Sequence, residues 1–422
     1  MNAREYLKIA ALRGSKLGLE RVTELCRKSG DPQEKLRIIH VAGTNGKGSF
    51  CAMLSGILSH SGYTVGGFSS PALTDVTESL TINGVPISDC EFEKIMAEII
   101  PYCEEMDDKP TEFEVLTAAA YLYFYKSGCD IAVVECGMGG DSDSTNVISS
   151  PVLSVITNVA ADHTAFLGDT IEKIARHKAG IIKPHRPVLY GGNNSAALEI
   201  IREISAKNNS PLIVSDMSRI NYSHSDLFGT EMDFSGFGRL KTPLSGTYQQ
   251  YNMANVMTAV EILRGEGFDI PQNSVVSGLS EVSHHGRFEI INRDPIVIFD
   301  GAHNPDGIIC AAESIKNYFN SKVVLLIGVM ADKEYRLYPE ILGKFTERAF
   351  TVIPDNPRAL DSEKLKNAFT EKGILAESYP NVSEGTLAAF KFASENGLPL
   401  IALGSLYMYR EFSQIYRENL RG

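Results

Sequence analysis

The sequence has no long apolar run and no surplus of basic residues. No stretch approaches the roughly 20 apolar residues that a membrane-spanning helix needs, so we expect no membrane segment. The formal net charge of −12 leaves no excess of basic side chains to attract nucleic acid or an anionic membrane surface. We therefore predict neither as a partner. An anionic substrate, which needs only a local basic patch, stays compatible with this charge.

Cysteine is also scarce. The seven cysteines are scattered and never form a CxxC pair, and the nine histidines show no zinc-finger spacing. This distribution is typical of reduced, mostly buried thiols in a cytosolic protein. The first residues, Met1–Tyr6, carry charge where the apolar core of a signal peptide would begin. We therefore expect a cytoplasmic location.

The length and composition indicate a globular protein with more than one core. Hydrophobic residues make up 43% and charged residues 22% of the 422 residues, as in ordinary globular proteins. A chain of this length is too long for one hydrophobic core. We expect two or three domains.

A glycine-rich turn near the start of the chain predicts a phosphate-binding loop. Residues 36–41 form a short, mainly apolar run rich in β-branched residues, which indicates a buried strand, and residues 50–58 indicate a buried helix. In a turn between two such elements, backbone N–H groups converge on a phosphate, a lysine and the helix N-terminus add positive charge, and a serine hydroxyl can reach Mg²⁺. Val41 replaces the first glycine of the general pattern, and a turn that only caps a helix is the alternative. The turn is Gly43-Thr44-Asn45-Gly46-Lys47-Gly48-Ser49.

Further strands in the first half of the chain also end at polar loops. An apolar strand at 130–136 leads into 137–146, and a strand at 152–158 leads into Ala161-Asp162-His163-Thr164. A helix from about Thr170 is expected to run as far as Pro184. Strands that alternate with helices indicate a mostly parallel α/β sheet, in which ligands bind beyond the carboxyl ends of the strands.

The remaining elements suggest a second α/β domain. The apolar pattern lapses at 283–289 and then restarts, so we predict two α/β domains joined near residue 290. Residues 187–240 are less regular, with strand-like pieces and a possible antiparallel segment at 221–240. The other predicted elements are helices in 1–35 and at 89–106, 112–126 and 247–263, a hairpin at 80–87, and strands near 187–190, 211–215, 296–299, 322–328, 349–353 and 399–403.

Eight ordered motifs resemble those of folylpolyglutamate synthase, a family of ATP-dependent Mur ligases that often also have dihydrofolate synthase activity. The resemblance extends over nearly the whole chain. Its motifs are the phosphate loop, Gly137-Met138-Gly139-Gly140 with Asp143-Ser144-Thr145-Asn146, Asp162-His163-Thr164, Lys178-Ala179-Gly180-Ile181, Gly286-Arg287-Phe288-Glu289, Asp300-Gly301-Ala302-His303-Asn304-Pro305, Ala331-Asp332-Lys333 and Gly404-Ser405-Leu406-Tyr407.

The resemblance implies a fold and a reaction. The fold is an N-terminal P-loop ATPase domain with a mostly parallel sheet, over residues 1–291, and a smaller C-terminal Rossmann-like α/β glutamate ligase domain, over 292–422. The active site would lie in the cleft between them. ATP would form an acyl phosphate on a reduced folate or dihydropteroate, and the amine of L-glutamate would then displace phosphate. The family also implies a monomer.

The resemblance further implies roles for individual residues. Lys178 matches a lysine that the family carbamylates, which would turn a cation into an anion able to bind a metal. The implied catalytic residues are Lys47, Lys178, Asp300 and His303. The implied ligands of two Mg²⁺ ions are Ser49, Glu135, His163 and Lys178. The implied nucleotide-binding residues are Gly43, Thr44, Asn45, Gly46, Lys47, Gly48, Ser49, Gln249, Asn252, Arg287 and Asp300.

Each of these side chains also has a purely structural interpretation. Glu135 suits a hard cation, but it equally suits an ion pair or a helix cap. Without the resemblance, His163 would be interpreted as a core histidine and Lys178 as a helix-surface lysine. Asp300 and His303 lie among turn-forming residues and would then only cap a turn.

The sequence departs from the family pattern at five positions. Ala72 replaces a histidine, Ser79 an arginine, Asp141 the arginine of Gly-Gly-Arg, His177 a glutamate and Tyr248 a histidine. Asp141 reverses the local charge where a carboxylate substrate should pass, and like charges repel. A different carboxylate acceptor, or a non-catalytic nucleotide- or folate-binding protein, is therefore an alternative. A P-loop motor or transport ATPase is disfavoured because the standard lysine-threonine ending and any membrane or repeat element are missing.

Overall fold

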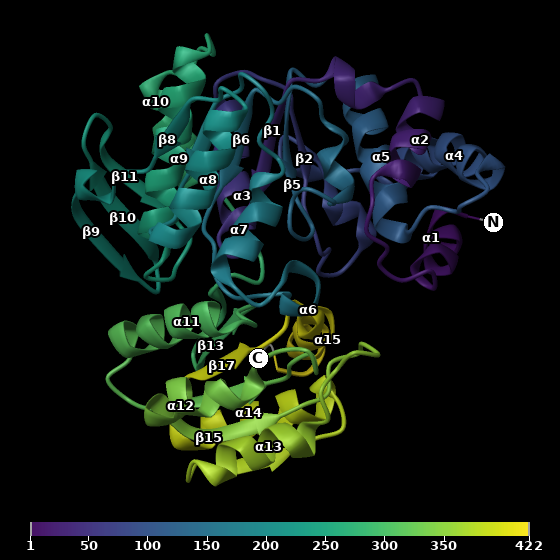
Figure 1. The fold of residues 1–422 in the computed structure, drawn as a ribbon. Helices are drawn as coiled ribbons and strands as arrows, with labels where there is room; N and C mark the ends of the chain where they lie inside the picture. The colour runs from purple at the N-terminus through teal and green to yellow at the C-terminus, as the bar shows by residue number, and fades with distance from the viewer. Residues whose placement is uncertain (1, 421–422) are drawn as a thin grey trace. The chain divides into compact units, whose positions relative to one another are not determined.

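The structure, a computed structural model, describes residues 2–420 as two compact units (Figure 1). Unit 1 runs to Asn221 and adds residues 234–240 and 251–282. Unit 2 comprises residues 222–233 and 241–250 and the described chain from Ser283. The predicted division of the chain at residues 291 and 292 stays a prediction.

Unit 1 is built on an eight-stranded, mostly parallel sheet. β1 (Ile38–Ala42) lies between β5 (Ile131–Glu135) and β6 (Leu153–Ile156), with Val41 beside Glu135 and Ala42 beside Ile156. Only β3 and β4, the strands of the predicted hairpin, run antiparallel to their neighbours, and Asn83 and Gly84 between them have positive φ. In sheet order the strands are β4 (Val85–Pro86), β3 (Leu80–Ile82), β2 (Val65–Phe68), β5 (Ile131–Glu135), β1 (Ile38–Ala42), β6 (Leu153–Ile156), β7 (Val188–Tyr190) and β8 (Leu212–Val214).

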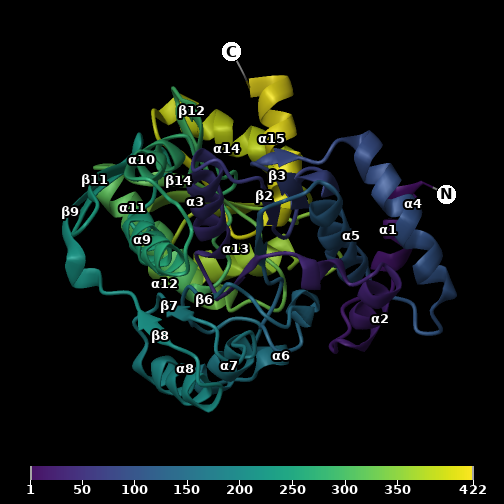
Figure 2. The same ribbon diagram turned by 90° about the horizontal axis from the view of Figure 1, so that it is seen from above.

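Helices pack against this sheet and form two apolar clusters with it. Figure 2 shows these helices around the strands. The strand residues in these clusters are apolar because neither face of the sheet meets water. The helices of the larger cluster are α1 (Ala3–Ala11), α2 (Glu20–Lys28), α4 (Asp89–Glu105) and α5 (Glu112–Lys126). Those of the other are α6 (Thr164–Leu167), α7 (Ile171–Ala179) and α8 (Ser195–Lys207). The remaining helices are α3 (Lys47–His60), α9 (Gln249–Gly265) and α10 (Gln272–Ser280).

Unit 2 holds a six-stranded sheet whose inner strands are parallel. Asp300 at the end of β13 (Ile296–Asp300) lies beside Leu403 at the end of β17 (Leu400–Leu403). In sheet order the strands are β12 (Glu289–Arg293), β13 (Ile296–Asp300), β17 (Leu400–Leu403), β14 (Val323–Ile327), β15 (Thr346–Thr351) and β16 (Ala376–Ser378). The helices are α11 (Pro305–Tyr318), α12 (Tyr338–Leu342), α13 (Ser362–Glu371), α14 (Val382–Asn396) and α15 (Tyr409–Ile415).

The predicted fold class is confirmed, and the less regular region contains more structure than expected. Its predicted antiparallel segment is a three-stranded sheet of β9 (Ile220–Asp226), β10 (Gly229–Phe234) and β11 (Gly238–Thr242). Helix α8 was not predicted from the sequence, although Asn194 caps its start. The prediction that the helix from Thr170 reaches Pro184 is wrong. α7 ends at Ala179 because Gly180 is packed against Asp141 and two tight turns follow.

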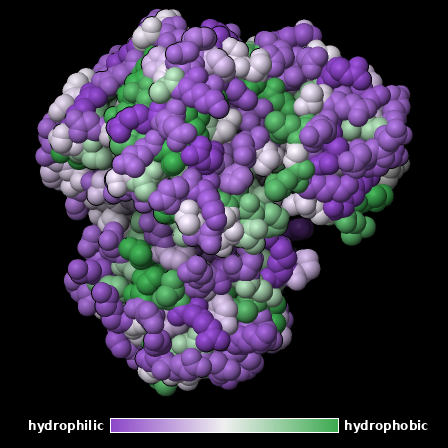
Figure 3. All heavy atoms as spheres, in the orientation of Figure 1, coloured by the Kyte–Doolittle hydropathy of each residue, from purple (hydrophilic) through white to green (hydrophobic). Residues whose placement is uncertain are grey.

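None of the helices among residues 2–420 has the length and apolar content to cross a membrane. On the face drawn in Figure 3, hydrophilic side chains predominate and hydrophobic ones form small separate patches. The seven cysteines are free thiols, and Cys26, Cys51, Cys103 and Cys136 are buried, as predicted.

Candidate functional site

The glycine-rich turn joins β1 to the first turn of α3. Gly43 and Gly46 have φ values of 148° and 82°, which glycine adopts more readily than other residues. A β-carbon on Gly43 would lie 1.9 Å from Thr157 Oγ1, and one on Gly46 would lie 2.5 Å from Asn252 Oδ1. The loop therefore tolerates no side chain at either position, and its backbone opens the amino end of a 14-residue helix, which attracts anions.

The loop that follows β6 fixes the shape of this turn. The backbone N–H of Thr44 donates to Asn158 O at 3.0 Å, and that of Asn45 donates to Asn158 Oδ1 at 2.7 Å. The Thr157 hydroxyl donates to Asn45 O at 2.7 Å. Thr157 and Asn158 are not among the site residues predicted from the sequence. Their position directly after a strand whose neighbour carries the turn was the available signal.

Lys47 and Glu135 lie beside each other at the carboxyl edge of the sheet. Lys47 Nζ is 3.9 Å from Glu135 Oε1 and donates to Gly43 O at 3.1 Å. Only 5% of the Glu135 side chain and 17% of the Lys47 side chain are exposed. Ser49 is buried on the first turn of α3. Glu135 is thus an ion-pair partner, as in its structural interpretation, and the same position also allows it to bind a metal cation.

Lys178 is buried, with a residue exposure of 3%, so it is not a helix-surface lysine. By contrast, 61% of the Lys173 side chain on the same helix is exposed, and this side chain pairs with Asp169. Burial and the charge of Lys47 lower the pKa of Lys178 to about 7, although Asp162 opposes the shift. A large fraction of this amine is therefore neutral and nucleophilic near neutral pH.

The loop after β5 packs tightly on the end of α7. A β-carbon on Gly140 would lie 2.7 Å from the carbonyl oxygen of Lys178. His177 Nδ1 lies 2.9 Å from Asp141 Oδ2. Two of the five departures from the family pattern therefore face each other as one pair. Asp141 thus has the ring of His177 as its partner.

His163 lies at the start of α6, in the left-handed backbone region with φ of 50°. Its backbone N–H donates to Asp162 Oδ1 at 2.8 Å, and 32% of its side chain is exposed. A core position is therefore excluded. Asp162 is buried beside it, and its charge acts on Lys178.

Helix α9 brings two predicted nucleotide-binding residues to its first turn. Gln249 is fully buried, and Asn252, with 7% exposure, is next to Gly46 of the phosphate loop. Asn255, one turn further along and 3% exposed, is close to Gly191.

In unit 2, Asp300 is held at the end of β13. Its Oδ1 accepts the N–H of Ala302 at 2.7 Å, and its Oδ2 accepts the N–H of Phe288 at 2.9 Å and the hydroxyl of Tyr248 at 3.1 Å. Burial raises the pKa of Asp300, against the opposing effects of Arg287 and these hydrogen bonds. The hydrogen bond from Ala302 lies within the turn and agrees with a turn-capping role for Asp300, whereas those from Phe288 and Tyr248 come from other segments.

His303 follows Asp300 in the same loop. Its Nδ1 lies 2.8 Å from Gly301 O, so this nitrogen carries the proton, and the Tyr338 hydroxyl donates to His303 O at 2.6 Å. The ring is half-buried. The loop is thus fixed on both sides of the imidazole.

The comparison with protein families gives two matches. Residues 41–260 match the Mur ligase middle domain, and residues 286–405 match the Mur ligase glutamate ligase domain. Dihydrofolate synthase/folylpolyglutamate synthase of Bacillus subtilis is 35% identical over 406 residues, which covers 93% of this chain and 94% of that protein. The chain belongs to the folylpolyglutamate synthase/dihydrofolate synthase family of Mur ligases.

Solved structures of this family have the same fold. The folylpolyglutamate synthase of Mycobacterium tuberculosis, complexed with ADP and AMPPCP, superposes with a TM-score of 0.90 at 27% identity, over 98% of each chain. FolC of E. coli, in complex with DHPP and ADP, gives a TM-score of 0.86 at 27% identity, over 99% of this chain and 98% of that one. The predicted family and the predicted class, an ATP-dependent ligase, are confirmed.

The donor set fits the Mg²⁺ ions expected of such a ligase. Within residues 2–420, no three His, Cys, Asp or Glu side chains group as a metal site. Mg²⁺ usually keeps several waters and binds one or two carboxylates together with substrate phosphates. Glu135 and Ser49, beside a loop suited to phosphates, match that requirement. A cage of protein ligands alone is not needed.

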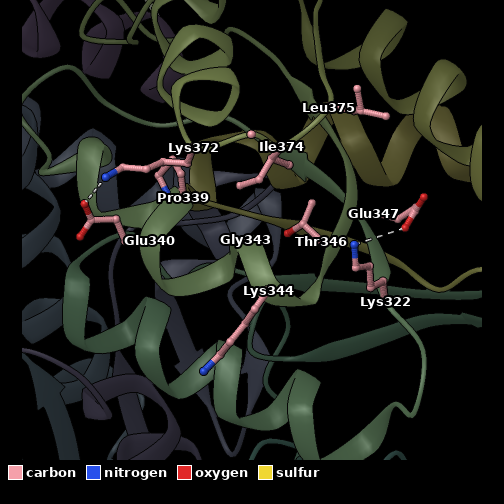
Figure 4. A pocket seen from close by; sticks show the side chains of 11 residues that line it. Lys322, Pro339, Glu340, Gly343, Lys344, Thr346, Glu347, Lys372, Ile374 and Leu375 are labelled. Carbon is pink, nitrogen blue, oxygen red and sulfur yellow. Dashed lines mark hydrogen bonds and ion pairs between the residues drawn. The ribbon is translucent and has the colours of Figure 1, made fainter.

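Unit 2 also has a cavity of about 570 Å³, whose lining includes none of the predicted site residues (Figure 4). It is near Lys322 and Thr346, where β14 and β15 begin, whereas Asp300 stands where β13 ends. Lys372 pairs with Glu340 at 2.6 Å, and Lys322 with Glu347 at 3.7 Å. The cavity contains no predicted site residue of the Mur ligase family.

Proposed function

We propose that this chain uses ATP to attach L-glutamate to the side-chain carboxylate of a reduced folate, as a folylpolyglutamate synthase. The observation that carries the proposal is the pair of Lys47 and Glu135 beside a phosphate-type loop, together with a buried Lys178 whose pKa the charge of Lys47 helps to lower. A protein that only bound nucleotide would not need a lysine buried at such a cost in solvation. Dihydropteroate is the second acceptor that we propose for testing.

The reaction has two steps. A carboxylate oxygen of the acceptor attacks the γ-phosphorus of ATP, and the bond from this phosphorus to the β,γ-bridging oxygen breaks. ADP is released, and the acceptor becomes an acyl phosphate. The neutral amine of glutamate then attacks the acyl carbon, loses a proton, and expels inorganic phosphate as the amide forms. Most of the catalysis in such transfers comes from positioning and charge stabilisation.

We assign phosphate binding to the backbone N–H groups from Gly43 to Gly48 and to the ammonium of Lys47. Asn252, Gln249 and Arg287 also bind the nucleotide. Asp300 and His303 orient the nucleotide and the incoming glutamate.

Mg²⁺ would be held by Ser49 and Glu135 at one position and by His163 and modified Lys178 at a second. When bound, it would neutralise phosphate charge during transfer.

We also propose that Lys178 is carbamylated. Its neutral amine attacks carbon dioxide and releases a proton, which forms an N-carboxylate. The lowered pKa supports this proposal. With ¹³C-labelled bicarbonate, we expect a carbamate signal by NMR in the wild-type protein that is lost in Lys178→Arg and kept in Lys173→Arg. A signal that persists in Lys178→Arg would contradict the assignment.

The test of the function is phosphate release from ATP with Mg²⁺ and L-glutamate, comparing tetrahydrofolate, dihydropteroate and no acceptor. We expect stimulation by tetrahydrofolate. Stimulation by dihydropteroate as well would make the enzyme bifunctional. If neither stimulates release while ATP still binds, the departures at Ala72, Ser79, Asp141 and His177 mark another acceptor or a non-catalytic protein. Sedimentation of the active protein would test the monomer that we propose.

A further inference from the structure

Tyr248 reaches Asp300 from the segment that precedes α9. Its hydroxyl donates to Asp300 Oδ2 at 3.1 Å. Tyr248 occupies one of the five positions at which the sequence departs from its family, and no catalytic or binding role follows from the sequence for a phenol there. The contact is entirely within unit 2.

The surroundings of Tyr248 hold the phenol in place. The backbone N–H of Gly246 donates to the Tyr318 hydroxyl at 2.8 Å, and that of Thr247 donates to Ser314 Oγ at 3.0 Å, so α11 anchors the segment. A β-carbon on Gly246 would lie 2.7 Å from the Tyr248 ring. The ring therefore packs directly on the chain that carries it, and its hydroxyl is presented by a fixed element.

Asp300 depends on such donors because it is only 3% exposed. A buried carboxylate stays ionised when hydrogen bonds replace its lost water. Ala302 supplies the donor for one oxygen, while Phe288 and Tyr248 supply two for the other. The two backbone donors come from the loop of Asp300 itself and from the neighbouring Gly286–Glu289 stretch. Tyr248 is the side-chain donor among these three, and it fixes the carboxylate plane from a third segment.

We propose that Tyr248 is a positioning residue for nucleotide binding, which acts by holding the Asp300 carboxylate in one orientation. The proposal rests on the proposed function only in giving Asp300 a nucleotide to bind. It requires no turnover. Loss of the phenol hydroxyl would leave Oδ2 with a single donor and free the carboxylate to rotate.

The test is the affinity for a non-hydrolysable ATP analogue with Mg²⁺, measured by calorimetry on the full chain. We expect Tyr248→Phe to weaken binding about tenfold to a hundredfold, the effect of losing one hydrogen bond to a charged group. Asp300→Asn should weaken binding at least as much, and adding Tyr248→Phe to it should have little further effect. In turnover assays the KM for ATP should rise while kcat changes less than the KM does.

Tyr379→Phe is the matched control. It removes another tyrosine hydroxyl of unit 2 that donates to a carboxylate, Glu377 Oε2, at 2.9 Å, and we expect wild-type affinity. Unchanged affinity in Tyr248→Phe would overturn the proposal, as would an equal loss in the Asp300→Asn background. Absence of turnover in the wild-type protein would contradict the proposed function and leave the calorimetric result decisive for Tyr248.

Discussion

At the scale of single residues, a cluster of buried polar side chains around His40 connects the loop that follows β5 to the core. His40 Nε2 lies 2.8 Å from Thr145 Oγ1 and 3.1 Å from Cys136 Sγ. The Thr145 hydroxyl donates to Asp143 Oδ1 at 2.5 Å, and Asp143 Oδ2 accepts the N–H of Met138 at 2.7 Å. These contacts fix the loop that packs against Lys178.

His40 makes stability dependent on pH. Burial lowers its pKa from 6.5 to about 3, so below pH 6.5 the unfolded chain binds a proton that the folded chain does not. This contribution to stability is complete above pH 6.5 and is lost as the pH falls toward 3. At pH 5 this effect lowers the free energy of unfolding by about 2 kcal/mol relative to its value well above pH 6.5.

Urea unfolding at pH 7.5 and pH 5.0 tests this prediction. We expect His40→Gln to lose less stability than the wild-type protein between the two values. His224→Gln, in which the replaced side chain is 59% exposed, should behave as wild type. An equal pH dependence in wild type and His40→Gln would contradict the account.

Residue types alone could not separate the lysines of α7. Lys173 and Lys178 are five positions apart, and only the resemblance singled out Lys178. The backbone of Lys178 packs against Gly140, and Gly180 packs against Asp141; both partners approach from a loop about 40 residues earlier in the chain. The Asp141–His177 pair was equally hidden, because each residue taken alone only looked like a loss of the family pattern.

At the scale of elements, the phosphate loop permits a controlled comparison between two glycines. Gly43 and Gly62 both have positive φ, but only at Gly43 would a β-carbon meet another atom within 4 Å. Alanine at either position strains the backbone by about 1 to 3 kcal/mol. We expect Gly43→Ala to weaken binding of the ATP analogue at least tenfold and Gly62→Ala to leave it unchanged. Equal affinities in calorimetry would show that the turn does not hold the nucleotide.

A buried ion pair ties α2 to α5. Arg21 Nε lies 3.0 Å from Glu114 Oε1, with side-chain exposures of 10% and 0%. Removing one partner leaves a charge without its main partner, so Glu114→Gln should cost about 3 kcal/mol of unfolding free energy. Glu105→Gln, which breaks an exposed pair with Lys28, should cost less than about 1 kcal/mol. Similar costs in urea unfolding would contradict this assignment.

Most elements that position the site follow from sequence patterns. Buried parallel strands are continuous apolar runs, and polar residues mark their carboxyl ends, so β1, β5 and β6 were predictable. The end of α7 was not, because Gly180 and the loop after β5 stop the helix before Pro184 is reached.

At the scale of the whole molecule, the two α/β units were predictable from the strand–helix alternation. Which segments of the chain belong to each unit was not. Residues 222–233 and 241–250 group with unit 2 although unit 1 residues follow both. Tyr248 lies in the second of these segments, so its contact with Asp300 depends on long-range packing that local patterns do not encode.

The most direct test of the central claim follows oxygen atoms. Tetrahydrofolate labelled with ¹⁸O in its side-chain carboxylate is incubated with the enzyme, ATP, Mg²⁺ and L-glutamate, and the released phosphate is analysed by mass spectrometry. An acyl phosphate places one carboxylate oxygen in each phosphate, so we predict singly labelled phosphate in amounts equal to the glutamylated product. Unlabelled phosphate formed together with product would contradict the proposed reaction.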